Sequence, residues 1–230
     1  MTITTTYDDF SIKELISQID DQRISLPRYQ RDVVWPPDKK RRLIDSVLNG
    51  FPIGSLLLAE VEDVTDGVAR KTFRIIDGLQ RTSTFRSYLV EPEAYIQTSW
   101  VRTEWIETSR HIIAAVSNMP VADDSLRQAI YEFMLRSHVS RDRLALFSVY
   151  SRAFSLDVND FVIAADQLDA LVAGLIGDIN ESLDIGAIRI PVIKFIGTPE
   201  DQATAFERLN TGSVDRKSTR LNSSHANISY

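Results

Sequence analysis

The residues with the clearest capacity for chemistry lie where an apolar run ends and a helical pattern begins. The run 71–76 is followed by Asp77 and Gly78, and helical spacing of apolar residues starts at Leu79. A helix that begins in this way directs N–H groups and its positive dipole end toward one point, where anions bind. Gly78 permits a tight turn, and Arg81 can offer a two-pronged guanidinium to phosphate. The segment therefore predicts a phosphate-binding turn.

The side chains around this turn extend the prediction. Gln80, Thr82 and Ser83 add neutral hydrogen-bond donors. Asp77 suits a magnesium ion beside a phosphate, because Mg²⁺ prefers carboxylate, water and phosphate oxygens, or it could orient a water molecule. A simpler alternative stays open, in which Asp77 only caps the helix and Arg81 pairs with a surface acid.

Two further segments carry groups that could contact a ligand. Gln30 and Arg31 lie in an extended stretch, where Arg31 could bind a phosphate while Tyr29 or Trp35 stacks on a base. The alternative for this stretch is a core Trp35 and a solvated Arg31. The end of the last expected helix presents Asn210, which by itself is an ordinary helix terminus.

One basic cluster occurs in an acidic chain. The 230 residues carry a formal net charge of −6, so the overall field does not draw the protein onto nucleic acid. Any DNA contact must be local, and its best candidate is the run Lys39, Lys40, Arg41 and Arg42. Such a run is also typical of the solvated face of a helix.

Several classes of protein are excluded by residues that the sequence lacks. It contains no cysteine, which excludes disulfides, thiolate nucleophiles and thiolate metal sites. His111 and His138 lie in separate helical stretches without a ligand partner, so a zinc site is not expected. No Walker-type, HExxH or GxSxG motif occurs.

With neither a membrane-length apolar run nor a signal-like start, we expect a cytoplasmic protein that makes no membrane contact.

Apolar periodicity predicts the elements that position these residues. Asp8 and Ser11 can cap a first helix, and a second begins at Pro37 and ends near Leu48. Runs 55–61 and 71–76 predict a β-hairpin across a turn-rich segment.

The second half of the chain is predicted to be mainly helical. Four or five helices are expected between about 95 and 185. Residues 187–195 return to strand composition, in which Pro191 indicates an edge strand or a bulge. Thr198 and Pro199 then predict the start of a last helix, with a capping hydroxyl followed by proline.

The C-terminal residues 215–230 have a different character. Residues 215–225 look like a translated short-read sequencing adapter, because such an oligonucleotide would encode them without a mismatch, and residues 226–230 look like its continuation. We expect this segment to be non-native and exclude it from fold and function, with the natural protein continuing differently after Val214. A natural polar tail is the alternative.

Three blocks, in this order and spacing, resemble the N-terminal domain family of GmrSD-type restriction endonucleases, a branch of the ParB and sulfiredoxin-like fold. The first comprises Gln30 to Trp35 with Pro52 to Ser55, the second Ile76 to Thr84, and the third Phe206 to Gly212. The second block is similar to the family pattern I-D-G-Q-Q-R-x-T-T, but Leu79 replaces its first glutamine.

The resemblance implies an α+β fold, in which a small ParB-like mixed β core carries a large helical insertion at about 95–185 of a domain spanning 1–214. It also implies that the chain binds a nucleoside triphosphate with Mg²⁺ and hydrolyses it. The chain would then be the regulatory, DNA-sensing part of a system that restricts modified, often phage, DNA. An HNH-type nuclease module is expected in the same chain or a partner, and an oligomer is compatible with this role.

The resemblance also suggests roles for individual residues. Asp77 and Arg81 are expected to act in catalysis, with Asp77 also on the metal. The expected nucleotide contacts are Gln30, Arg31, Gly78, Gln80, Thr82 and Asn210. The alternative function is a non-catalytic DNA-binding module that uses Lys39, Lys40, Arg41 and Arg42.

Overall fold

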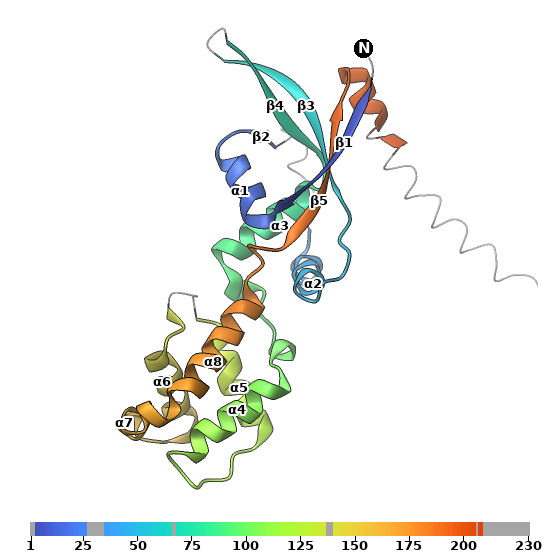
Figure 1. Cartoon of the computed structure of the whole chain (residues 1–230). Coiled ribbons are helices and arrows are strands. Elements are labelled where there is room, and N and C mark those ends of the chain that lie inside the picture. Colours follow the sequence, from blue (N-terminus) through green and yellow to red (C-terminus); the bar gives the residue numbers. More distant parts are fainter. Residues whose placement is uncertain (1–2, 27–34, 66–67, 137–139, 206, 209–230) are drawn as a thin grey trace, which may run out of the picture. The chain divides into compact units, whose positions relative to one another are not determined.

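The computed structural model describes residues 3–26, 35–65, 68–136, 140–205 and 207–208. The chain divides into two compact units (Figure 1). The sheet unit comprises Met1–Val34, Ile53–Thr82 and Ala187–Tyr230. The helical unit comprises Trp35–Pro52 and Ser83–Gly186.

The described part of the sheet unit contains a five-stranded mixed sheet of order β1-β5-β3-β4-β2. β1 (Thr4–Ser11) pairs antiparallel with β5 (Arg189–Ile196), which pairs parallel with β3 (Leu56–Thr65). β3 and β4 (Val68–Asp77) form the predicted antiparallel hairpin, and β4 pairs parallel with the short β2 (Ile24–Ser25). Together with the helices described in the following paragraphs, this sheet confirms the expected α+β class.

The first helix, α1 (Ile12–Asp20), is confirmed with one change in its cap. The Ser11 side chain accepts from the Glu14 N–H at 3.1 Å, and the Glu14 carboxylate accepts from the Ser11 N–H at 2.7 Å. This reciprocal capping box explains why the helix starts at Ile12. Asp8, the other expected cap, lies within β1 instead.

The prediction that Pro191 marks an edge strand or a bulge is wrong. β5 lies between β1 and β3, and its pairing with β1 runs in continuous register through Pro191 opposite Asp9. Pairing with β3 begins one residue later, at Val192. At Pro191, β5 therefore pairs with a neighbouring strand on one side only. Proline, which has no backbone N–H, is tolerated at such a position.

Acidic side chains on and beside β1 give the sheet unit a predictable response to acid. A hydrogen bond from Lys194 lowers the pKa of Asp8, one from Arg189 lowers the pKa of Asp9, and the Ser11 backbone N–H lowers the pKa of Glu14. Groups with lowered pKa values stabilise the fold above their ordinary pKa and lose that contribution as the pH falls through the folded value.

We therefore expect amide protection in β1 to fall when the pH drops below about 4. Hydrogen exchange followed between about pH 3 and pH 6 measures this change. The double variant Asp8→Asn and Asp9→Asn should show a flatter pH dependence in β1. An unchanged pH dependence in that variant would show that these carboxylates do not cause the effect.

The helical unit is built mainly from helices that follow one another along the chain. α3 (Leu79–Val90) begins in the sheet unit and continues into the helical unit, which also contains α2 (Pro37–Leu48) and the short turns η1 (Pro92–Ala94) and η2 (Thr98–Trp100). Between residues 95 and 185 the described part has five α-helices, as predicted. They are α4 (Thr103–Ala114), α5 (Asp123–Met134), α6 (Arg143–Phe154), α7 (Val158–Ile163) and α8 (Ala165–Leu183).

Buried aromatic residues hold this unit together. Phe147 and Phe161 stack with ring centroids 5.1 Å apart. The fully buried Tyr150 donates its hydroxyl to Ser109 at 2.5 Å, and Ser109 donates to the Trp105 carbonyl at 2.7 Å, so both polar groups are satisfied inside the core. Within the described part, no helix combines the length and the apolar character needed to cross a membrane.

Candidate functional site

The predicted turn between a strand and a helix is present. β4 ends at Asp77, and α3 begins at Leu79. Gly78 between them has φ +103°, in the region that favours glycine, and a Cβ placed there would lie 2.2 Å from Leu56 Cδ2. Both the backbone conformation and the packing against Leu56 therefore require glycine.

Arg81 connects this turn to the chain segment that precedes β3. Its Nη1 donates to the carbonyls of Ile53 at 2.9 Å and Gly54 at 2.8 Å, and its Nη2 donates to the Ser55 carbonyl at 3.0 Å and to Asp77 Oδ2 at 2.7 Å. The side chain is 13% exposed. We call this set of four bonds the Arg81 clamp.

The clamp changes the role expected of Arg81. A guanidinium has four hydrogens on its two Nη atoms, and here each Nη makes two bonds inside the protein. In this arrangement Arg81 positions other groups and does not present a fork to a phosphate. The simpler alternative, pairing with an acid, describes it better, and the acid is Asp77 itself.

The segment held by the clamp is one that sequence reasoning left without a role. Gly54 has φ +77°, and a Cβ there would lie 3.1 Å from Arg81 Nη1. Two signals in the sequence were consistent with the clamp. One is the four-residue spacing of Asp77 and Arg81, and the other is the glycine in the segment Pro52 to Ser55.

The groups at the turn that remain suited to a ligand are few and well defined. The Asp77 side chain is 53% exposed, and only its Oδ2 is engaged by Arg81. Thr82 is 2% exposed, and its hydroxyl has no hydrogen-bond partner among the described residues. Gln80 and Leu79 are half-buried. The first turn of α3 adds backbone N–H groups and a positive dipole end.

This donor set fits a magnesium ion only in the company of a phosphate. In the ranges that the structure describes, no group of three or more His, Cys, Asp or Glu side chains could hold a metal. Mg²⁺ commonly takes one or two carboxylates and completes its shell with water and phosphate oxygens. Asp77 can supply one such carboxylate.

The orphan hydroxyl of Thr82 leads to a stability prediction. A buried hydroxyl without a partner costs roughly 1–3 kcal/mol. We expect Thr82→Val, which keeps the shape and removes the hydroxyl, to raise the free energy of unfolding by about 1 kcal/mol in ligand-free protein. Urea unfolding measures the change. The neighbouring Ser83→Ala, at an exposed position, is the control and should have almost no effect, whereas destabilisation by Thr82→Val would show that the hydroxyl is satisfied.

Three of the other expected site residues cannot be placed. These are Gln30, Arg31 and Asn210, which lie outside the described residues. Their proposed contacts with a nucleotide stay predictions.

The basic run lies on α2 in the helical unit, and part of its charge is engaged there. Lys39 Nζ lies 4.1 Å from the centroid of the Trp35 ring. Arg41 pairs with Asp38 at 3.2 Å and donates weakly to the Ala94 carbonyl at 3.4 Å. The DNA contact expected of this run stays a prediction.

A known protein family matches most of the chain. The family model described as the GmrSD restriction endonuclease N-terminal domain matches residues 12–222. The match includes the β4–α3 turn and the Arg81 clamp, and it ends within the segment 215–230, so the boundary proposed at 214 stays a prediction. A search of curated proteins finds no match.

Proposed function

Because the chain belongs to the N-terminal domain family of GmrSD restriction endonucleases, we propose that it binds a nucleoside triphosphate with Mg²⁺ at the β4–α3 turn and hydrolyses it. Membership of the family implies a role in a restriction system. Within that role, this chain would be the nucleotide-dependent, DNA-sensing part, and a nuclease module of the HNH type, in the same chain or a partner, would cut modified DNA.

The observation that supports this proposal most directly is the junction of Asp77, Gly78 and Leu79. Gly78 makes the turn tight and packs against the Leu56 side chain, so a phosphate would approach the first-turn backbone of α3 beside Asp77 rather than Gly78 itself. The first-turn N–H groups of α3 would bind the phosphate oxygens, and the half-exposed Asp77 carboxylate is close to them in the chain. The buried Thr82 hydroxyl is a further donor without a partner of its own.

Hydrolysis at such a site requires mainly positioning and charge stabilisation. Asp77 would hold the metal or orient the attacking water, while the backbone N–H groups hold the phosphates. Mg²⁺, when bound, would neutralise charge on the phosphate oxygens. Arg81 would act on the reaction only through the clamp, by fixing Asp77 and the segment Ile53 to Ser55. Arg31 and Asn210 are proposed to complete the pocket.

Titration with nucleoside triphosphates, with and without Mg²⁺, tests the proposal on wild type and Asp77→Asn. Asparagine keeps a carbonyl oxygen that can accept from Arg81, so the clamp is retained while the charge is lost. We expect the Mg²⁺-dependent part of the affinity to fall at least about tenfold in the variant. The proposal fails if no triphosphate binds to the folded protein, or if both proteins show the same Mg²⁺ dependence.

The alternative, a DNA-binding module, would use the cations of α2 that make no ion pair within the described part. These are Lys39, which lies over the Trp35 ring, together with Lys40 and Arg42, since Arg41 pairs with Asp38. DNA held in this way is released steeply as salt concentration rises, whereas a nucleotide bound with Mg²⁺ is affected much less. The double variant Lys40→Ala and Arg42→Ala separates the two functions, because it should weaken DNA binding and leave triphosphate binding unchanged.

A further inference from the structure

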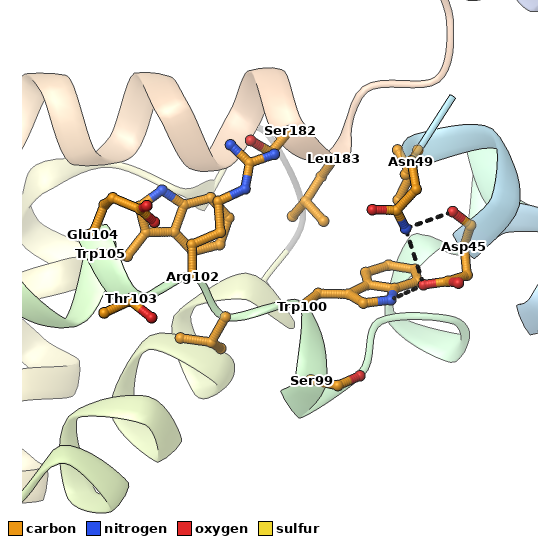
Figure 2. Close-up of a pocket in the computed structure, with 12 residues that line it drawn as sticks. Asp45, Asn49, Ser99, Trp100, Arg102, Thr103, Glu104, Trp105, Ser182 and Leu183 are labelled. Atoms are coloured by element: carbon orange, nitrogen blue, oxygen red, sulfur yellow. Dashed lines mark hydrogen bonds between the residues drawn. The ribbon is translucent and has the colours of Figure 1, made fainter. Parts of the chain in front are cut away.

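The helical unit contains a polar cavity of about 560 Å³ that has no part in the proposed function. Three helix ends and the turn η2 line it (Figure 2). Its volume falls within the range of roughly 300–1,000 Å³ that small-molecule sites occupy. The charged groups around it lie in two places, and their arrangement indicates the kind of ligand.

Asp45, Asn49 and Trp100 form one end of the cavity. The Trp100 indole N–H donates to Asp45 Oδ1 at 2.8 Å, and the Asn49 amide donates to the same oxygen at 3.3 Å and to the Asp45 carbonyl at 2.8 Å (Figure 2). These bonds fix the half-buried indole ring and leave Asp45 Oδ2 and the Asn49 carbonyl oxygen as acceptors. A carboxylate beside an aromatic face suits an organic cation.

Two helix ends strengthen the preference of this region for positive charge. α2 ends at Leu48 and α8 ends at Leu183, and both residues line the cavity. Neither helix has a basic residue in its last turn. The C-terminal end of a helix carries a partial negative charge, so the end of α2 adds to the attraction exerted by Asp45, and the end of α8 adds less because its Leu183 carbonyl accepts from the Tyr88 hydroxyl at 2.7 Å. The third helix end is the positive N-terminus of α4 at Thr103, next to Arg102 in the chain.

Arg102 and Glu104 form the second charged group of the cavity lining. In Figure 2, Leu183 lies between these two residues and Asp45. The guanidinium of Arg102 lies 5.2 Å from the centroid of the Trp105 ring. Both Arg102 and Glu104 are exposed, and neither side chain makes a hydrogen bond or ion pair with another described residue, whereas the backbone carbonyl of each accepts a hydrogen bond within α4. Arg102 can therefore bind a carboxylate through two parallel bonds, and Glu104 can accept from an ammonium group.

We propose that this cavity binds a free basic amino acid of the arginine type. The two carboxylates and one guanidinium of the cavity match the two cations and one carboxylate of such a ligand. Its side-chain cation lies on Trp100 beside Asp45. Its α-carboxylate pairs with Arg102, and its α-ammonium group pairs with Glu104.

Calorimetric titration with L-arginine, citrulline and agmatine tests each part of this assignment. Citrulline lacks the side-chain charge, and agmatine lacks the carboxylate. We expect L-arginine to bind and each analogue to bind at least about tenfold more weakly, since each loses one charge-assisted pair. No binding of L-arginine to the folded protein, or equal binding of all three compounds, overturns the proposal.

Two variants assign the ends of the ligand. Asp45→Asn keeps an oxygen for Trp100 and should abolish the preference for arginine over citrulline. Arg102→Gln should abolish the preference for arginine over agmatine. If each variant weakens all three compounds equally, the charge pairing is wrong. Asp77→Asn, measured without nucleotide, is the control that should bind L-arginine like wild type, so this test is independent of the proposed nucleotide site.

Discussion

Arg81→Ala is expected to lower the free energy of unfolding by about 3 kcal/mol. The substitution leaves three backbone carbonyls and the Asp77 carboxylate without the donors that they share in the clamp. The arginine side chain is 13% exposed, so water replaces these donors only after the local structure opens. Urea unfolding measures the global effect, and hydrogen exchange of the β3–β4 hairpin and the first turn of α3 measures the local one.

Two further variants show whether the clamp causes this loss. Arg81→Lys retains the charge, but an ammonium group offers three donors from one point and cannot reach four acceptors arranged around a planar fork, so it should recover less than half of the loss. Arg152→Ala breaks an exposed pair with Glu132 and should cost no more than about 1 kcal/mol. Full rescue by lysine, or equal losses for both alanine variants, would contradict the clamp.

The clamp also separates two ways of losing nucleotide binding. Arg81→Ala should reduce stability and binding together, because Arg81 acts by holding Asp77 and the segment before β3. Asp77→Asn should reduce Mg²⁺-dependent binding while stability changes little. A variant that loses binding without losing stability therefore identifies a group that contacts the ligand, and Arg81 is not expected to be one.

Elements with local signals were predictable from the sequence. Ser11 and Glu14 are three residues apart and form the capping box that starts α1. Thr198 and Asp201 form an equivalent reciprocal pair at the start of the last helix, which is helical over residues 199–205. Each of these signals lies within one turn of the element that it begins.

Features that depend on distant residues were not predictable. β1 is polar and mostly exposed, and it becomes a strand through pairing with β5, as in the contact of Asp9 with Arg189, 180 residues later. The Arg81 clamp uses carbonyls 26 to 28 residues earlier. Backbone carbonyls are present at every position, so no pattern of side chains marks them as partners. The turn at Gly78 was foreseen, but the atoms that fix it were not.

Gly78→Ala is expected to destabilise the protein by about 3 kcal/mol or more, for two reasons that add. At φ +103° an alanine is strained whatever the space around it, and its Cβ would lie 2.2 Å from a methyl group of Leu56, which is fully buried. Neither Leu56 nor the turn can move away freely, because the Arg81 clamp holds the carbonyl of Ser55, the preceding residue. Urea unfolding of the variant measures the sum.

Gly50→Ala separates backbone strain from the collision. Gly50 also has a positive φ, +71°, but a Cβ there meets nothing within 4 Å, so this variant should lose only about 1 kcal/mol. Leu56→Ala is destabilising by itself, yet combined with Gly78→Ala it should cost less than the sum of the two, because the alanine at 78 then has room. If Gly78→Ala costs no more than Gly50→Ala, or if the double variant is additive, contact with Leu56 does not fix the turn, and the requirement for glycine lies in the backbone alone.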